Sequence, residues 1–165
     1  MYEYKAPEHA VFRDRSFPMP LVEITVPAGF LPTPEKQALM KDLTTAVLKA
    51  EGVPDSPRSR SLTWILIHEV DHGHWAIAGS PPASLRFLVR VTVPLGAVSL
   101  ARKRRMGLEI YRLLSKAAGK PLATDEAWIL VYEIPDGHWT AAGKTLQLKD
   151  LTAFVGLQLP PGSRR

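Results

Sequence analysis

Three histidines lie close together near the middle of the sequence, and such a cluster is the first place to look for metal chemistry. They are His68, His72 and His74. A metal site needs its ligands to converge on one point. Here His68 is expected at the end of a strand, and the other two are expected on the turn that follows. We therefore expect no metal ion and interpret these histidines as structural.

Composition excludes several other kinds of chemistry. The 165 residues include no cysteine, which removes disulfides, thiolate metal sites and thiol nucleophiles together. Hydrophobic residues make up 45% and charged residues 22%, as in ordinary globular domains. No apolar run approaches the roughly 20 residues that span a bilayer, and the charged first residues do not form a secretory signal. The expectation is a cytoplasmic protein without membrane contact.

Positive charge is concentrated in the second half of the chain. Residues 1–82 carry 8 basic and 10 acidic side chains, a net of −2, whereas residues 83–165 carry 13 and 6, a net of +7, which sums to the overall +5. The densest cluster is Arg102-Lys103-Arg104-Arg105. No aromatic-rich strand or helix-turn-helix pattern accompanies it, as nucleic-acid recognition would require. We interpret the cluster as a solvated helix face, with an anionic partner as the alternative.

The strongest signal is an internal duplication. The segment 67–79 aligns with 131–143 at an offset of 64, and six identical residues coincide, among them Gly73-His-Trp with Gly137-His-Trp. Upstream, Ile24-Thr-Val-Pro aligns with Val91-Thr-Val-Pro at an offset of 67. The chain therefore contains two copies of one unit, and the difference of three residues falls in the loop 53–61.

Each copy is predicted to fold as strand, helix, strand. In the first copy the expected elements are a strand Leu21–Val26, a helix capped by Thr33 and stopped by Gly52, and a strand Leu62–His68. In the second copy they are a strand Phe87–Val93, a helix from a Ser99 cap to Gly119, and a strand Trp128–Tyr132. Right-handed crossovers then give an α/β fold in two layers, with a four-stranded sheet and both helices on one face.

The predicted domain boundaries follow the duplication. Residues 1–19 are an extension and residues 20–157 one domain, made of unit one (20–80), unit two (85–143) and a tail with a strand (144–157), before a loose end at 158–165. The face of the sheet without helices is expected to be apolar and uncovered. That pattern indicates assembly with further copies of the chain, tied together by the tail strand.

At this point the residues resemble a known family. Pro20-Leu-Val-Glu-Ile-Thr-Val, a loop glycine, a Glu-Lys helix start and Ile67-His-Glu-Val-x-x-Gly-His-Trp-x-x-Ala-Gly are similar to the 4-oxalocrotonate tautomerase family of the tautomerase superfamily. The tandem units resemble a fused member of that family. The resemblance implies a homotrimer, a small-molecule substrate and no cofactor.

The resemblance assigns the catalytic role to Pro20. Family members use an amino-terminal proline, whose secondary amine takes a proton from carbon next to a carbonyl group. An internal proline nitrogen is an amide and cannot act as a base. Two possibilities stay open: Pro20 is the mature amino terminus, which follows Met19 directly, or the chain lacks the family's usual chemistry.

The substrate-binding residues depart from the family pattern. Phe30 and Trp64 stand where relatives that act on dicarboxylates carry arginines, and the second unit has Ala97 and Trp128 there. Since a guanidinium grips a carboxylate and these side chains cannot, a dicarboxylate substrate is not expected. Replacement charge is available from Arg58 and Arg60, and from Arg86 and Arg90.

The expected activity is that of a tautomerase-type isomerase acting on a small enolisable carbonyl compound. Pro20 is its base, and Trp75, Phe30 and Trp64 line an apolar pocket. Decarboxylation and hydrolytic dehalogenation occur in the same superfamily and stay open. The alternative is a tautomerase-fold protein without proline chemistry, which binds a small molecule or serves as a structural subunit.

Overall fold

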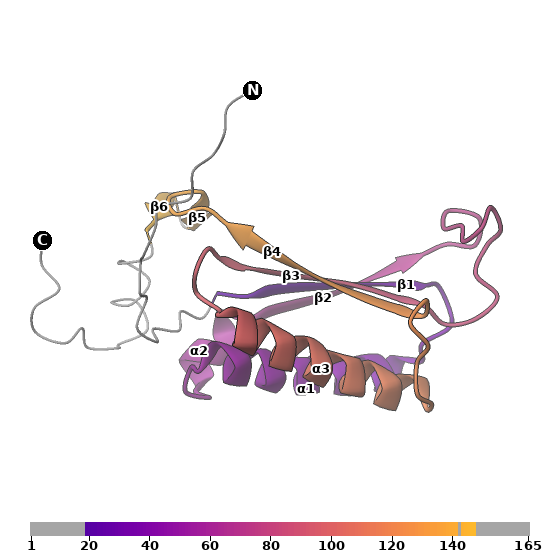
Figure 1. Ribbon diagram of the computed structural model, residues 1–165. Helices are drawn as coiled ribbons and strands as arrows, with labels where there is room; N and C mark the ends of the chain where they lie inside the picture. The colour runs from indigo at the N-terminus through magenta and orange to yellow at the C-terminus, as the bar shows by residue number, and fades with distance from the viewer. Residues whose placement is uncertain (1–18, 142, 148–165) are drawn as a thin grey trace, which may run out of the picture.

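The computed structural model describes residues 19–141 and 143–147, which form a four-stranded sheet with two long helices on one face (Figure 1). The elements are β1 (Leu21–Pro27), α1 (Thr33–Glu51), α2 (Pro57–Ser61), β2 (Trp64–Val70), β3 (Phe87–Pro94), α3 (Leu100–Ala118), β4 (Ala127–Ile134), β5 (Trp139–Ala141) and β6 (Lys144–Leu146). The predicted α/β architecture of two tandem β-α-β units is confirmed. Residues 1–18 of the expected extension 1–19, and most of the expected tail strand, lie outside the described residues.

The order of strands in the sheet is β2-β1-β3-β4. Within each unit the two strands are parallel, whereas β1 and β3 pair antiparallel where the units meet. Leu21, the first residue of β1, therefore pairs with Thr92 near the end of β3. The two halves of the chain thus point in opposite directions, and corresponding residues lie at opposite ends of the sheet.

Capping residues define both long helices, with one correction to the prediction. The N-cap of α1 is Pro32 and not Thr33, and Pro32 has no side-chain oxygen to accept a capping hydrogen bond. In α3 the Ser99 hydroxyl oxygen accepts from the Arg102 N–H at 3.4 Å, as predicted. Gly52 and Gly119 end the helices with φ of 69° and 68°, a left-handed conformation that favours glycine.

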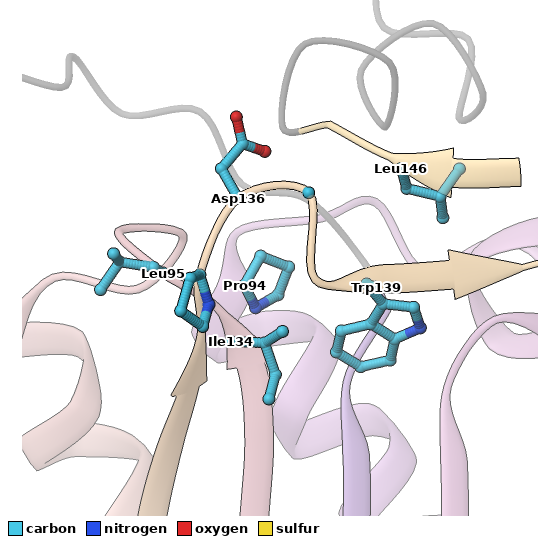
Figure 2. A pocket seen from close by; sticks show the side chains of 8 residues that line it. Pro94, Leu95, Ile134, Asp136, Trp139 and Leu146 are labelled. Carbon is cyan, nitrogen blue, oxygen red and sulfur yellow. The ribbon is translucent and has the colours of Figure 1, made fainter.

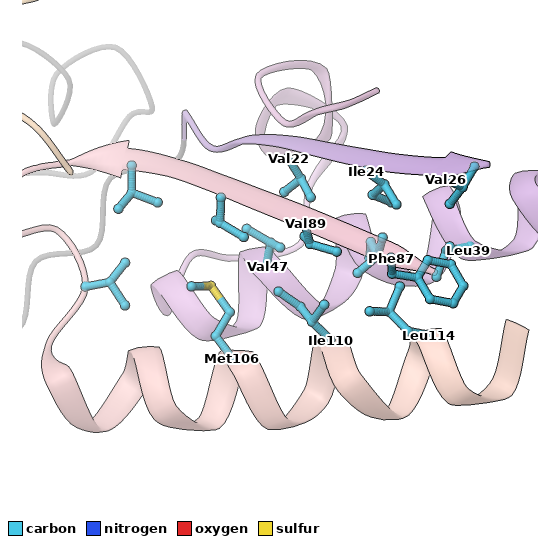
Figure 3. Packing of buried hydrophobic residues seen from close by; sticks show 14 of the residues in the cluster. Val22, Ile24, Val26, Leu39, Val47, Phe87, Val89, Met106, Ile110 and Leu114 are labelled. Atoms are coloured by element: carbon cyan, nitrogen blue, oxygen red, sulfur yellow. The ribbon is translucent and has the colours of Figure 1, made fainter. Parts of the chain in front are cut away.

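The core lies between the sheet and the two long helices (Figure 3). Alternate residues of β1 and β3 point toward the helices, because successive side chains of a strand face opposite sides. Residues four apart on α1 and α3 meet them from the other layer. The fully buried members of this packing include Val22, Ile24, Val26, Leu43, Val47, Val89, Val91, Ile110 and Leu114.

The segment before β2 differs from the prediction. The expected loop contains the short helix α2, in which the Ser56 hydroxyl oxygen accepts from the Ser59 N–H at 3.1 Å. Because this turn runs on to Leu62, the strand begins at Trp64 and extends to Val70, two residues later than expected at each end. The three residues by which the copies differ fall in this segment.

The open face of the sheet carries exposed apolar side chains, as the sequence predicted. They are Trp64 and Leu66 on β2, and Trp128, Leu130 and Tyr132 on β4. Nothing in the described part of the chain covers them. None of the helices in residues 19–141 has the length and apolarity to cross a membrane.

Candidate functional site

Pro20, the expected catalytic residue, is buried immediately before β1. Its carbonyl oxygen accepts a hydrogen bond of 3.1 Å from the N–H of Trp64, so it lies beside the start of β2. Met19 precedes it, is only 9% exposed and belongs to the hydrophobic core. With Met19 attached, the Pro20 nitrogen is an amide whose lone pair is delocalised into a carbonyl group. In that form the nitrogen is not basic.

The topology separates Pro20 from two of the residues expected around it. Phe30 follows the end of β1 and Trp75 follows the end of β2, so both lie at the end of the sheet away from Pro20. A seven-residue strand such as β1 spans about 23 Å. Within one copy of the chain these aromatic side chains are therefore not brought together with Pro20, whereas Trp64 is adjacent to it.

The second unit supplies the aromatic side chain at the Pro20 end. Trp139 is the counterpart of Trp75 and follows β4, whose end lies beside the end of β3 and hence near the start of β1. Sequence reasoning did not assign it to Pro20, because the duplication does not reveal that the two units pair antiparallel. The identity of Gly73-His-Trp and Gly137-His-Trp was the available signal.

A small cavity lies at this end of the sheet. Its lining includes Pro94, Leu95, Ile134, Trp139 and Leu146. Figure 2 shows Pro94, Ile134 and the indole of Trp139 turned toward the same space, while the Asp136 carboxylate points away from it. The surface that this end of the sheet offers a small molecule is therefore mainly apolar.

The two arginines of α2 lie at the Pro20 end of the sheet. Arg60 donates from Nε and Nη2 to the two carboxylate oxygens of Asp55 at 2.6 and 2.7 Å, and from Nη2 to Thr45 Oγ1 at 2.8 Å. The hydrogen bond from Arg60 lowers the pKa of Asp55. Its guanidinium is thus engaged within the α1–β2 connection, while Arg58 is exposed.

Of the other two candidate arginines, Arg86 precedes β3 and has an acidic partner, and Arg90 lies within β3. Arg86 donates to Glu126 Oε1 at 3.1 Å. The pKa of Glu126 is lowered, first by its hydrogen bond from Lys120 and further by the Ala123 N–H and the charge of Arg86. Arg90 stands opposite Glu23 in the register of β1 and β3.

Glu69 and Glu133 perform the same structural task in the two units. Glu69 Oε1 accepts from the Gly29 N–H at 3.2 Å, and its Oε2 lies 2.7 Å from Lys36 Nζ. Glu133 repeats both contacts with Gly96 and Lys103 at 3.1 and 2.6 Å. The bond from Lys36, and then the bond from Gly29, lowers the pKa of Glu69. Each glutamate fastens the loop after one strand to the next helix.

The histidines do not form a metal centre. The run His68-Glu69-Val70-Asp71-His72 has the letters of the H-E-x-x-H zinc motif, which requires a helix to bring both histidines to one face. Here the first three residues belong to β2, and His68 Nε2 lies 3.1 Å from Glu23 Oε1. Among residues 19–141 and 143–147, no three His, Asp or Glu side chains gather as metal ligands would.

The sequence reasoning missed one further ionisable residue, Glu51. It is the last residue of α1 and is 0% exposed, and neither of its carboxylate oxygens has a hydrogen-bond partner among the described residues. Burial raises the pKa of this carboxyl group well above its usual value. The signal was a glutamate four residues after Val47 on the apolar stripe, where the second unit has Ala118.

Comparisons with known proteins agree with this fold. Residues 20–84 match the family described as "Tautomerase enzyme", so the match begins at Pro20. No curated protein matches the sequence at a significant level. Three similar solved structures have TM-scores of 0.60 to 0.67, and each match spans nearly all of the other protein's length.

The first is a fused 4-OT described as a wild-type asymmetric trimer, with TM-score 0.65, 20% identity, and coverage of 76% of this chain and 94% of that one. The second is a member of the cis-3-chloroacrylic acid dehalogenase family, with TM-score 0.67, 21% identity, and coverage of 84% and 92%. The third is a macrophage migration inhibitory factor-like protein from Entamoeba histolytica, with TM-score 0.60, 14% identity, and coverage of 78% and 99%.

Proposed function

We propose, on the premise that the chain belongs to the tautomerase superfamily, that it moves a proton on a small enolisable carbonyl compound with the Pro20 amine as base. The observation that carries this proposal is that the matched domain begins at Pro20, a residue buried at the end of the sheet. The active form is then the one in which Pro20 is the amino terminus.

The chemistry requires only this amine. A free secondary amine takes a proton from the carbon next to a carbonyl group and returns a proton to the carbonyl oxygen, which interconverts the keto and enol forms. An apolar surrounding lowers the pKa of an amine, because desolvation disfavours the cation. Pro20 is itself buried, which supports such a surrounding.

The residues near Pro20 favour a substrate with an aromatic or alkyl part. Trp64 stands at the start of β2, and Trp139 and Ile134 lie at the same end of the sheet. Arg60 is already paired with Asp55, so a dicarboxylate would need that pair to open. A second copy of the chain would have to supply Phe30 or Trp75 if either contacts the substrate.

We propose a homotrimer as the assembly that covers the open face of the sheet. The five exposed apolar residues on β2 and β4 need a partner, and the fused 4-OT of similar fold is described as a trimer. Further copies of this chain present the same apolar surface to one another. The edge of each sheet would then approach a neighbouring copy.

The test compares two forms of the protein, one with residues 1–165 and one that begins at Pro20, each with and without Pro20→Ala. Ketonisation of the enol of phenylpyruvate is followed by ultraviolet absorbance. In the form that begins at Pro20, we expect acetylation of the amino terminus, which turns the amine into an amide, to lower kcat/KM by about 100-fold or more, as loss of a general base does. Pro20→Ala in that form replaces the secondary amine by a primary amine, whereas in the 165-residue form it has no effect on the rate, because residue 20 is there joined through an amide. Equal rates with and without acetylation of the shorter form would refute the proposal.

The second candidate function is binding without proline chemistry. It is favoured by Met19, whose side chain is packed into the core next to Pro20. A protein that keeps Met19 holds an amide at Pro20 and binds a small molecule without turnover. Saturable binding of phenylpyruvate by the 165-residue form, with no ketonisation by either form, would support this second function.

A further inference from the structure

Glu51 continues a row of core residues along α1. Leu39, Leu43 and Val47 are spaced four apart, are buried and face the sheet, and Glu51 is the next position in that row. It is as fully buried as Leu43 and Val47, at 0% exposure. A carboxyl group therefore occupies a position at which this spacing predicts an apolar side chain.

Pro20 continues the matching row on the strand. Val26, Ile24 and Val22 alternate along β1 and face the helices, and Pro20 is the next position of that alternation. Two strand residues advance about 6.6 Å and four helix residues about 6 Å, so the rows stay in step. In Figure 3 Val26 lies by Leu39 at one end and Val22 toward Val47 at the other. The next pair in this order is Pro20 with Glu51.

The duplication supports the same pairing. The counterparts of Pro20 and Glu51, at the offset of 67, are Phe87 and Ala118. By this correspondence the large Phe87 of the strand is matched with the small Ala118 of the helix, whereas the small Pro20 is matched with the larger Glu51. We therefore expect the Glu51 carboxyl group to occupy the space that corresponds to that of the Phe87 ring in the second unit.

The buried carboxyl group has no polar partner within residues 19–141 and 143–147. Neither oxygen accepts or donates a hydrogen bond there, and leaving a buried polar group unsatisfied is unfavourable. Two cations near this end have other acceptors: Arg102 donates to the backbone oxygen of Glu51 at 3.0 Å, and Arg60 donates to Asp55. Glu23 lies on the other face of the sheet, by the alternation of β1.

We propose that Glu51 is the acidic partner of the Pro20 amine, a positioning residue that holds the proton of that amine. The inference rests on the proposed function, because only a chain that begins at Pro20 has an amine at this place. An ionised carboxylate beside the amine stabilises its cationic form and so raises its affinity for a proton. Glu51 then sets the pH range over which Pro20 is available as a base.

The direct test measures the titration of the Pro20 nitrogen by NMR in the form that begins at Pro20, with 15N-labelled proline and no substrate. All described elements start after Pro20, and circular dichroism checks that this form is folded. We expect Glu51→Gln to lower the pKa of the Pro20 amine by about 1 unit or more. The control Glu69→Gln, at the other end of the sheet, leaves that pKa unchanged. An unchanged pKa in folded Glu51→Gln protein would overturn the inference.

A second measurement excludes a merely structural role for Glu51. In the 165-residue form, Glu51→Gln and Glu51→Leu are expected to keep or raise the melting temperature, because they remove an unsatisfied carboxyl group. A fall in melting temperature for both would show that Glu51 serves the fold and would overturn the inference. The titration needs no turnover, so a shifted amine pKa in a chain that fails to ketonise enols would sustain the role of Glu51 and refute only the proposed reaction.

Discussion

Glu23 and Arg90 stand directly opposite each other across β1 and β3, and each is the counterpart of the other in the duplicated sequence. The offset of 67 residues that relates the first strand of each unit turns Glu23 into Arg90. This pair therefore marks a pseudo-two-fold axis through the centre of the sheet. Because of this axis, the start of β1, which follows Pro20, lies at the same end of the sheet as the end of β4, which precedes Trp139.

The two loop-fastening glutamates should contribute independently to stability, because the axis places them at opposite ends of the sheet. Glu69→Gln and Glu133→Gln each remove an ion pair and weaken a hydrogen bond to a backbone N–H. We expect each to lower the free energy of unfolding by about 1 kcal/mol, since these groups are partly exposed. Urea unfolding of the single and double variants measures the effects. A double variant that loses much less than the sum would contradict the independence of the two contacts.

The buried Glu51 should make stability depend on pH in the direction opposite to most carboxylates. Its pKa in the folded chain is raised above the ordinary value of 4.5. Below pH 4.5, Glu51 is protonated in both the folded and the unfolded chain. Above pH 4.5, Glu51 loses its proton in the unfolded chain but keeps it in the folded chain, so the unfolded chain becomes more stable relative to the folded one. The 165-residue protein should therefore lose stability from about pH 4.5 upward relative to Glu51→Gln. Urea titrations from mildly acidic to neutral pH measure the difference.

Glu69 provides the comparison of opposite sign. Its pKa is lowered in the folded chain, so its contribution is present above its ordinary pKa of 4.5 and is lost as the pH falls below that value. At neutral pH the free energy of unfolding of the 165-residue protein should exceed that of Glu69→Gln, and this difference should shrink in acid.

Glu51→Gln should instead be more stable than the 165-residue protein at neutral pH, and that difference should also shrink in acid, where Glu51 is protonated in both the folded and the unfolded chain. If the stability of Glu51→Gln depended on pH in the same way as that of the 165-residue protein, burial would not be holding Glu51 neutral.

Substitution on the open face should block assembly, whereas substitution on the helix face should not. Trp128 on β4 and Leu100 on α3 are almost equally exposed, at 62% and 63%. We expect the assembly of the 165-residue form to have three times the mass of the 18.3 kDa monomer, and Trp128→Glu to yield monomers because it places a charge among apolar residues. Leu100→Glu is the matched control and keeps the larger mass. Light scattering after size-exclusion chromatography measures the mass of each assembly. An unchanged mass for Trp128→Glu would contradict assembly through the open face of the sheet.

Sequence patterns predicted the elements well, because local chemistry fixes them. The glycines that end α1 and α3, the Ser99 cap and the apolar stripes are all local signals, and each was confirmed. The Thr33 cap was wrong by one residue, since Pro32 already has the extended conformation of an N-cap. The helix α2 was missed because its five residues leave too little periodicity to detect.

The arrangement of the site was harder to predict, because it depends on contacts between distant residues. No local feature of the sequence predicts that β1 and β3 pair antiparallel. For this reason the sequence alone predicts Trp75, and not Trp139, as the aromatic residue near Pro20. Glu51 escaped notice because glutamate is common near helix ends, where it is usually exposed. Only the packed structure shows that its carboxyl group is buried without a hydrogen-bond partner in the part of the chain that is described.

The most direct test of the central claim is the amino terminus of the protein purified from its natural source, by intact mass and amino-terminal sequencing. We predict a chain that begins at Pro20, with a free secondary amine at the end of the sheet. A mature chain that retains Met19 or any residue before it would contradict the claim, because its Pro20 nitrogen would be an amide and could not act as a base.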